Sequence, residues 1–476
     1  MKRSGLRLPH RLRRLLFIYI VYIIIFGALI YMIPVHVKEL PETAGYYSRT
    51  YGPDRAVLVE RPQDAFARRI EIMRSAEKTL DVCYHCVKAG DTTECMFAEM
   101  LRAADRGVKV RVMLDGAIGG LTGEHENIDI ALRSHPNVEF RAYNPVNLLK
   151  PWGWNARLHD KFIVADDRMM MLGGRNIGDE YFAPPGYDGN VTYDRDVIVI
   201  NTEAGKGKES GSVIYEVSDY MDVLWNAKET KAFGKLTERG RKKGLEEQER
   251  IKKTASAMER SFPAYYEPES PAEDISVPSG KISLLHNPVT PFKKEPVTGA
   301  VIAELLSEHK DIRIQTPYAT VNRSTLKALK NIADGSNVDF LTNSMTSTPN
   351  LPAFSTYVTQ RRKFMDTGIN IYEYQSTDSI HGKTYTADGH LSIVGSLNLD
   401  DRSLYIDTES VLVIDSPEFC SILDGELDRL FERSARVGQD NEYEETQGVD
   451  IVEVTPLKKA LVYVTSVFSR LFEYLV

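Results

Sequence analysis

The sequence predicts an α/β protein of two similar lobes, related by a pseudo-twofold axis, behind an N-terminal transmembrane helix. Three observations lead to this prediction. A nineteen-residue run without charged side chains occupies 15–33. Strand-like and helix-like hydrophobic patterns then alternate in each half of the remaining chain, which is typical of α/β lobes. Finally, one short motif of chemically active side chains occurs once in each half, so the functional site is expected between the lobes.

The composition is that of a globular protein with an acidic body. The chain has 476 residues, of which 42% are hydrophobic and 26% charged, with a net charge of −8. Its first fourteen residues contain six basic and no acidic side chains, so the remainder is more acidic still. Such a body is unsuited to gripping nucleic-acid phosphates over a broad surface, and we expect no nucleic-acid partner. Four cysteines in a chain of this length exclude a disulfide scaffold.

The apolar run near the N-terminus predicts a signal anchor. At a rise of about 1.5 Å per residue it spans roughly 28 Å, close to the ~30 Å hydrocarbon core of a bilayer. A cleaved signal peptide is the alternative, but the run exceeds a usual signal-peptide core and no A-x-A site follows it. The preceding basic cluster favours a cytoplasmic N-terminus in the cell membrane, a single span and an extracytoplasmic body. The expected segments are a basic terminus at 1–14, the anchor at 15–35 and a juxtamembrane stretch at 36–61.

The first lobe is expected over 62–226. Asp91, with Glu94 three residues later, predicts a capping box at the start of a helix, and Gly107 stands where such a helix would end. A second amphipathic helix is expected at 212–225. Strands are expected at 78–87 and 109–114, and the methionines at 169–171 continue a buried strand.

The second lobe is expected over 280–435, with the same alternation of strand and helix. Its expected elements are strands at 311–316, 338–342 and 369–374 and a helix at 324–332. Between the lobes, 227–279 predicts a linker, charge-rich first and then rich in Pro, Glu and Ser. A solvated linker or surface helix is favoured there over a face that binds anionic head groups. The tail at 436–476 contains an amphipathic helix, and both docking on the body and lying in a membrane interface stay open.

The motif H-x-K-x4-D is the most informative feature of the sequence. Its two copies comprise His159, Lys161 and Asp166 in the first half, and His381, Lys383 and Asp388 in the second. In each copy an asparagine follows the histidine by seventeen residues, at Asn176 and Asn398. A single copy arises easily by chance, whereas two copies with matched downstream residues do not.

The residue types and spacing of the motif suit a displacement reaction at phosphorus. Histidine and lysine two positions apart on a strand project from the same face. Histidine is suited to act as nucleophile or proton donor near neutral pH, and an in-line displacement places attacker and leaving group on opposite sides. Two histidines therefore serve one phosphorus better than one. Paired lysines, the asparagine amides and the Ser396 hydroxyl would stabilise the developing charge without a metal or other cofactor, and we expect none.

These residues resemble the phospholipase D superfamily, most closely its bacterial cardiolipin synthase branch. Similar segments include GGRNIGDEYF at 173–182, GSLNLDDRSLYIDTE at 395–409, RGVKVRVMLDG at 106–116 and TPYATVNRSTLKAL at 316–329. The resemblance covers about 55–435. It implies a membrane-anchored phosphatidyltransferase acting on phospholipids, which makes cardiolipin from two phosphatidylglycerols with release of glycerol.

The resemblance also implies roles for individual residues. One histidine, taken to be His159, becomes phosphatidylated, while His381 acts as acid and base. Carboxylates orient the histidine of the opposite half, with Glu409 and Asp194 as the candidates (Asp196 being the weaker alternative to Asp194). Asp166 and Asp388 are expected to hold the loop and strand. Substrate-binding donors are expected at Asn176, Asn398 and Ser396, and Gly174 stands where Ser396 has its hydroxyl, so the first half offers one donor fewer.

Several alternatives remain open at this stage. The enzyme could be a phospholipase D that uses water, a nuclease of the same superfamily, or a catalytically silent lipid-binding scaffold. Arg157 is a candidate phosphate neighbour, and Tyr318 and Asn343 either line the site or pack. The nearby cysteines Cys83, Cys86 and Cys95 favour core packing over a metal site, with a disulfide possible. The sequence does not predict the oligomeric state.

Overall fold

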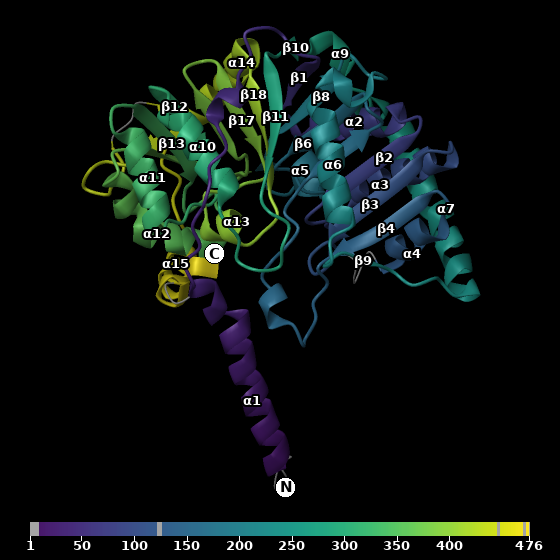
Figure 1. Cartoon of the computed structure of the whole chain (residues 1–476), viewed down its shortest axis with the longest axis horizontal. Helices are drawn as coiled ribbons and strands as arrows, with labels where there is room; N and C mark the ends of the chain where they lie inside the picture. The colour runs from purple at the N-terminus through teal and green to yellow at the C-terminus, as the bar shows by residue number, and fades with distance from the viewer. Residues whose placement is uncertain (1–8, 121–125, 445–447, 470–472, 476) are drawn as a thin grey trace.

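A computed structural model describes residues 9–120, 126–444, 448–469 and 473–475. It shows two sheet-and-helix lobes side by side, with the N-terminal helix leaving the body at one end (Figure 1). The predicted fold class is confirmed. The internal repeat extends to the strand order, because β1-β8-β6-β5-β2-β3-β4 in the first sheet is matched by β11-β18-β17-β16-β12-β13-β14 in the second. In both lobes the last three strands of this order run parallel and the others antiparallel.

The strands of the first sheet alternate with helices along the chain. Its strands are β1 (Asp54–Val59), β2 (Thr79–Tyr84), β3 (Lys109–Asp115), β4 (Val138–Tyr143), β5 (Phe162–Ala165), β6 (Met169–Gly173), β8 (Asp196–Asn201), β9 (Lys231–Ala232) and β10 (Val277–Pro278). The helices of this half are α2 (Pro62–Ser75), α3 (Asp91–Asp105), α4 (Glu126–Ser134), α5 (Asp179–Phe182), α6 (Val213–Trp225), α7 (Glu238–Ser261), α8 (Pro263–Tyr266) and α9 (Ala272–Ile275).

The second sheet follows the same plan. Its strands are β11 (Lys281–His286), β12 (Asp311–Gln315), β13 (Asn337–Asn343), β14 (Asn370–Tyr374), β16 (Thr384–Ala387), β17 (Leu391–Gly395), β18 (Ser410–Asp415) and β19 (Ser434–Arg436). Its helices are α10 (Val297–Ser307), α11 (Arg323–Ala333), α12 (Leu351–Met365), α13 (Asp401–Tyr405) and α14 (Pro417–Phe431). The strands and helices predicted from the hydrophobic pattern in both lobes are thus confirmed, with ends shifted by a few residues.

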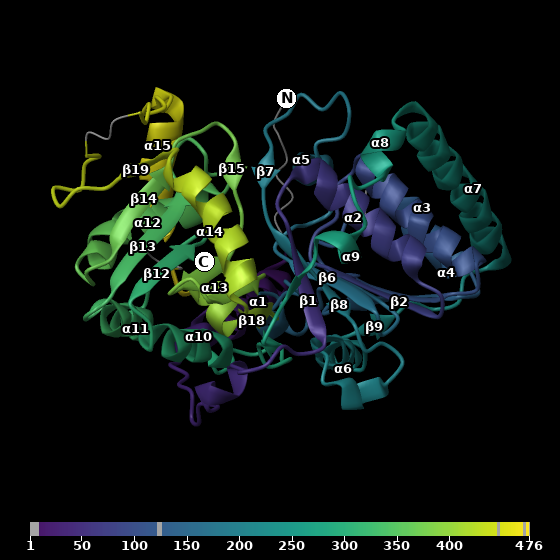
Figure 2. The ribbon, with the colours of Figure 1, turned by 90° about the horizontal axis from the view of Figure 1, so that it is seen from above.

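One apolar core joins the two lobes. Buried side chains of α6 and of the first sheet, among them Val217 and Val197, form a single cluster with Leu412 of β18 and Phe419 of α14. Separate cores lie on the outer faces, under α2 and α3 in the first lobe and under α10, α11 and α12 in the second. Seen from above, α14 and α6 lie near the junction of the two sheets, on opposite sides (Figure 2). Because the two lobes bury apolar side chains against each other, this shared core fixes their relative placement.

Two expected segments differ from the structure. Within 36–61, which was expected to be juxtamembrane, residues 54–59 form β1 and pair with β8 and β10. The expected linker 227–279 belongs largely to the first lobe, where it supplies α7, α8, α9, β9 and β10. The charge-rich run folds as α7 because Gly244, Gln248, Ile251 and Ala255 form a narrow buried stripe against α3 and α4.

The start of α3 also differs from the prediction. Asp91 is the first helical residue rather than the cap, since the cap position is Gly90 and makes no side-chain bond. The free backbone N–H groups of Asp91 and Thr92 instead donate to the carboxylate of Asp179, at 3.2 and 3.0 Å. The capping box was therefore wrong, because a tertiary contact supplies the acceptor. At the other end, Gly107 adopts a φ of +98°, as its expected place after the helix requires.

Both chain ends carry apolar helices. The first is α1 (His10–Gly27), continued by the short helix η1 (Leu29–Met32). The segment 10–32 is long and apolar enough to cross a membrane, and an 18-residue window within it has a mean hydropathy of 2.6. Near the C-terminus, α15 (Pro456–Ser469) packs against α12 and buries Val462 in the second core. The open question about this helix is answered in part, since it docks on the body.

Replacing Asp179 with alanine should lower the free energy of unfolding by about 1–2 kcal/mol, because two helix N–H groups lose their acceptor. Asp91→Ala should cost less, as its side chain caps nothing. Urea denaturation of the two variants and the wild type makes the comparison. An equal or larger loss of unfolding free energy in Asp91→Ala would contradict this account and indicate that Asp91 caps the helix after all.

Candidate active site

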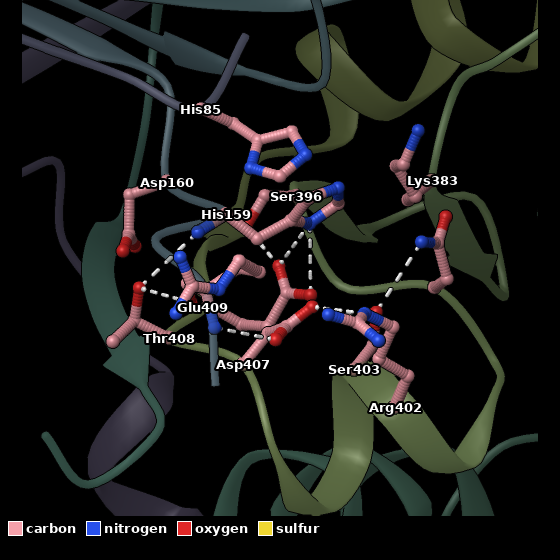
Figure 3. A network of polar contacts seen from close by, with 12 residues as sticks. His85, His159, Asp160, Lys383, Ser396, Arg402, Ser403, Asp407, Thr408 and Glu409 are labelled. Carbon is pink, nitrogen blue, oxygen red and sulfur yellow. Dashed lines mark hydrogen bonds and ion pairs between the residues drawn. The ribbon is translucent and has the colours of Figure 1, made fainter. Parts of the chain in front are cut away.

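The two motifs bring their histidines and lysines to equivalent places at the lobe junction. His159 and Lys161 precede β5, and His381 and Lys383 precede β16, the corresponding strand of the second lobe. All four side chains are buried. Figure 3 shows the surroundings of His159, with Lys383 of the other lobe across from it.

Backbone pairing between the lobes fixes each histidine. His159 N–H donates to the carbonyl of Thr408 at 3.2 Å, and Thr408 N–H donates back to Arg157 at 3.0 Å. In the other half, β15 (Ser379–Ile380) pairs with β7 (Thr192–Tyr193), and His381 N–H donates to Tyr193 at 2.6 Å. The two junctions are equivalent, so the residue that follows Thr408 or Tyr193 comes to lie beside the histidine of the opposite lobe.

Those following residues are the two carboxylates that the resemblance implied. The Nδ1 atom of His159 lies 2.9 Å from Glu409, and the Nδ1 atom of His381 lies 2.5 Å from Asp194 (Figure 3 for the first pair). Each pair is thus formed across the lobe boundary. Because Nδ1 is engaged by a carboxylate, Nε2 is left as the ring nitrogen that can attack or transfer a proton.

The lysines are held close to the same histidines. Lys161 Nζ donates to the carbonyl of His159, and Lys383 Nζ donates to the carbonyl of His381 and lies 2.8 Å from its Nδ1. Burial lowers the pKa of Lys383 to about 7 against the opposing charge of Asp194, and burial also lowers the pKa of Lys161. When protonated, these two buried lysines favour binding of an anion such as a phosphodiester.

Burial and the neighbouring cations keep both imidazoles neutral. Burial, followed by the charge of Lys161, lowers the pKa of His159 well below its usual value. Burial and Lys383 lower the pKa of His381 to about 4, although Asp194 opposes them. In this resting state each histidine can accept a proton or attack through its lone pair.

The two carboxylates differ in their electrostatics. Burial opposes ionisation of Asp194, but the charge of Lys383 and the interaction with His381, which includes a hydrogen bond, outweigh it and lower its pKa to about 2. Burial raises the pKa of Glu409 well above its usual value, although Lys161 opposes it. The anionic partner therefore stands beside His381, where it stabilises a protonated ring more strongly than Glu409 does at His159.

Asp166 and Asp388 are not brought to the histidines, although the motif contains them. Both lie in turns at left-handed φ, 53° and 49°. The Asp166 carboxylate accepts three backbone N–H groups, from Glu77, Lys78 and Thr79, at 2.7–2.9 Å. Asp388 does the same work in the second lobe for 310–311. They tie the turn after the motif strand to the segment that leads into β2 or β12, so their contacts are with backbone rather than with His159 or His381.

The donors expected to bind substrate fall into two groups. The amides of Asn176 and Asn398 are buried in equivalent positions, donating at 3.2 Å to Tyr181 and Ser403, and in each the Oδ1 atom lacks a partner among the described residues. The free Oδ1 can accept from a ligand hydroxyl, whereas a phosphate oxygen would need the second N–H of the same amide. The Ser396 hydroxyl instead donates to Glu409. At Gly174, a Cβ would lie 2.4 Å from Asp194 Oδ1, so the missing side chain leaves room for that carboxylate.

Some neighbours of the histidines were missed or assigned differently. His85, at the end of β2, packs its ring 4.6 Å from that of His159 and binds the Leu158 carbonyl through Nδ1 at 2.5 Å. The sequence placed His85 only in a strand. Tyr318 lies near the site, its ring 5.9 Å from that of His381, whereas Asn343 holds the backbone of Ile380.

Arg157 and the cysteines have structural surroundings. The buried Arg157 guanidinium donates to Asp115 and to loop carbonyls, so it holds the loop before the motif. Cys83 and Cys95 are buried in the cores, Cys86 is half-buried, and none of them is in a disulfide. Within the described ranges, no cluster of His, Cys, Asp and Glu could hold a metal ion.

Comparison with known proteins supports the same reading. Residues 70–221 and 301–431 match the family model described as cardiolipin synthase, PLD-like domain. The chain is 27% identical over 408 residues to cardiolipin synthase C of Escherichia coli, covering 77% of this chain and 82% of that protein. It is 29% identical over 400 residues to an uncharacterized protein of Helicobacter pylori, covering 76% of each. The structure resembles phosphatidylserine synthase of Haemophilus influenzae, with a TM-score of 0.61 and 16% identity over 88% of this chain and 95% of that one.

Asp166→Ala should lower the free energy of unfolding by about 2 kcal/mol or more, because three backbone N–H groups lose their acceptor. Turnover per folded molecule should change little. Urea denaturation and activity assays of this variant are compared with Asp188→Ala, an exposed loop aspartate. Lost turnover at unchanged stability would put Asp166 in the chemistry.

The pH dependence of kcat/KM should show an alkaline decline above about pH 7. The ammonium form of Lys383 exists below its lowered pKa and is lost as the pH rises through it, which removes positive charge from the site. In Lys383→Arg the cation persists, so the decline should move to higher pH even if the maximal rate falls. A wild-type profile that stays flat to pH 9, or an unmoved decline in the arginine variant, would contradict this account.

Proposed function

Since the chain belongs to the cardiolipin synthase, PLD-like domain family, we propose that it makes cardiolipin from two molecules of phosphatidylglycerol. The family and the fold make it a phospholipid-modifying enzyme of the phospholipase D type. The observation that carries the finer proposal is the pair of buried histidines, each oriented by a carboxylate from the opposite lobe. This arrangement supplies two ring nitrogens to one site, as an in-line displacement requires.

In the first step His159 attacks the donor phosphodiester. Its Nε2 forms a bond to phosphorus while the bond from phosphorus to the glycerol oxygen breaks. His381, protonated when the anionic substrate is bound beside Asp194, gives its proton to that oxygen, and glycerol leaves. The product of this step is a phosphatidyl-histidine. Lys161 and Lys383 stabilise the negative charge on the non-bridging oxygens.

The second step transfers the phosphatidyl group to the acceptor lipid. His381, now neutral, takes the proton from the acceptor hydroxyl, whose oxygen forms a new bond to phosphorus. The bond between phosphorus and His159 breaks, which restores both histidines and releases cardiolipin. The amides of Asn176 and Asn398 each use one N–H within their own lobe, and the second N–H of each is the neutral donor for a phosphate oxygen.

The assignment of His159 as nucleophile rests on the difference between the two pairs. The ionised Asp194 stabilises an imidazolium at His381, as a group that carries a proton needs. His159 faces Glu409, whose pKa is raised, and keeps a neutral ring suited to attack. If Glu409 rather than Asp194 were the ionised carboxylate, His159 would be the better proton carrier and His381 the better nucleophile.

The apolar N-terminal helix supports a place at the bilayer. We propose that α1 spans the cell membrane with its basic end in the cytoplasm and the body outside. The phospholipid substrates are then partners within the membrane that holds the enzyme.

Purified protein with phosphatidylglycerol should yield cardiolipin and glycerol, and His159→Ala and His381→Ala should each lose on the order of 10³-fold or more of this turnover. With radiolabelled phosphatidyl donor, rapid quenching should trap label on His159, accumulating in His381→Ala. Mass spectrometry of the products and of labelled peptides gives both readouts.

Other outcomes separate the rivals. Phosphatidic acid as the only product would make the protein a hydrolase. Label on His381 in the His159→Ala variant would reverse the two histidine roles. Complementation of a cardiolipin-lacking strain by His159→Ala as fully as by wild type would leave a catalytically silent lipid-binding protein.

A further inference from the structure

The loop between β4 and the first motif carries an unusual exposed apolar tip. Its residues 145–152 read PVNLLKPW, and the tip side chains are largely exposed, Val146 by 54%, Leu148 by 65% and Leu149 by 74%. Exposed aliphatic side chains gathered at one loop tip mark a surface that meets an apolar partner. The loop ends in the short helix η4 (Pro151–Gly153).

The tip lies against the N-terminal helix. The Tyr19 hydroxyl donates to the carbonyl of Leu148 at 2.7 Å, and the Tyr22 hydroxyl donates to the carbonyl of Leu149 at 2.9 Å. Nearer the body, Phe26 packs on Trp152 with ring centroids 6.3 Å apart. In Figure 1 the loop leaves the body at the same end as α1. Because Tyr19 and Tyr22 lie within the apolar run, a bilayer around α1 also surrounds the tip.

The carbonyl groups of residues 147–152 have the partners that an apolar surrounding requires. Each carbonyl from 147 to 152 accepts a hydrogen bond from the protein. The donors are Lys150 N–H and Trp154 Nε1 for 147, the Tyr19 and Tyr22 hydroxyls for 148 and 149, Gly153 N–H for 150, Trp154 N–H for 151 and the Tyr31 hydroxyl for 152. A loop in water needs no such partners, whereas in hydrocarbon an unpaired carbonyl is costly.

Lys150, the one charged residue of 145–152, can place its ammonium group in a polar region of the body. Lys150 lines a cavity of about 550 Å³ together with Lys228, Glu229 and Lys231. An ammonium group on a flexible stem can reach such a polar region while the stem stays among apolar atoms.

We propose that residues 145–152 are a second membrane-inserted element, a re-entrant loop that enters the bilayer beside α1 and is clamped there by the hydroxyls of Tyr19 and Tyr22. The occupant of the exposed apolar tip is the acyl region of the bilayer. The inference needs α1 in the membrane but not the proposed reaction.

The loop connects this contact to the histidine pair. At its base the Asn144 amide donates to the Gly153 carbonyl at 2.6 Å, and the Arg157 guanidinium donates to the same carbonyl at 3.0 Å. Arg157 lies two residues before His159, and its backbone carbonyl accepts a hydrogen bond from Thr408 N–H. Insertion of the loop would therefore fix the distance between His159 and the membrane surface.

Spin labels on single cysteines test the proposal in the full chain, reconstituted into phosphatidylglycerol and phosphatidylethanolamine vesicles. The background is Cys86→Ser, since the other three native cysteines are buried. Labels are placed at Leu148, at Ile20 of α1 and at Ile422, a 46% exposed aliphatic residue of α14. In Figure 1 the helix α14 lies at the end of the body away from α1. Collision with dissolved oxygen and with an aqueous nickel complex reports depth.

The expected result is loss of nickel collisions at Leu148, at about the depth of the Ile20 label, while the Ile422 label keeps them. Nickel access at Leu148 equal to that at Ile422 would overturn the proposal, whether or not Ile20 is protected. Tyr19→Phe with Tyr22→Phe keeps the helix apolar but frees two carbonyls, and it should shift the Leu148 label toward water. An unchanged depth in that double variant would overturn the clamp.

Discussion

Two histidine–carboxylate pairs that cross the lobe boundary are the constraint on which the site depends. Neither lobe holds a complete site, because Glu409 of the second lobe binds His159 and Asp194 of the first binds His381. Short backbone pairings set these contacts to within hydrogen-bond distance, and the shared core holds the lobes that carry them. The pseudo-twofold repeat is thus what places the two histidines at equivalent positions along the lobe boundary.

Symmetry of the backbone does not extend to the electrostatics. Ser396 binds Glu409 in one half, while Gly174 in the other leaves space for Asp194 to approach. Asp194 is held as an anion and Glu409 is pushed toward its neutral form, so the two histidines meet different fields. A two-step transfer needs such a difference, since one ring must form a covalent bond while the other carries protons.

Much of the fold and of the site follows from local sequence. The alternating hydrophobic pattern predicts the strands and helices of both lobes, and the repeated motif predicts His159 and His381 with their lysines. The failures have one cause, which is that the deciding contact lies far away in the chain. Asp179 caps α3 across 87 residues or more, β1 joins a sheet from a stretch that looks juxtamembrane, and α7 is identified as part of a lobe only by its packing on α3 and α4. The crossing of the carboxylates came from the family resemblance, and no local pattern contains it.

The crossed pairing is tested most directly by nitrogen NMR of protein labelled with ¹⁵N-histidine, with the resonances of His159 and His381 assigned by their loss in His159→Ala and His381→Ala. Glu409→Gln should move the Nδ1 resonance of His159 and leave that of His381 in place, and Asp194→Asn should do the reverse. If Glu409→Gln moves His381, or if neither carboxamide variant affects the histidine of the opposite lobe, the account of a site shared between the lobes is contradicted.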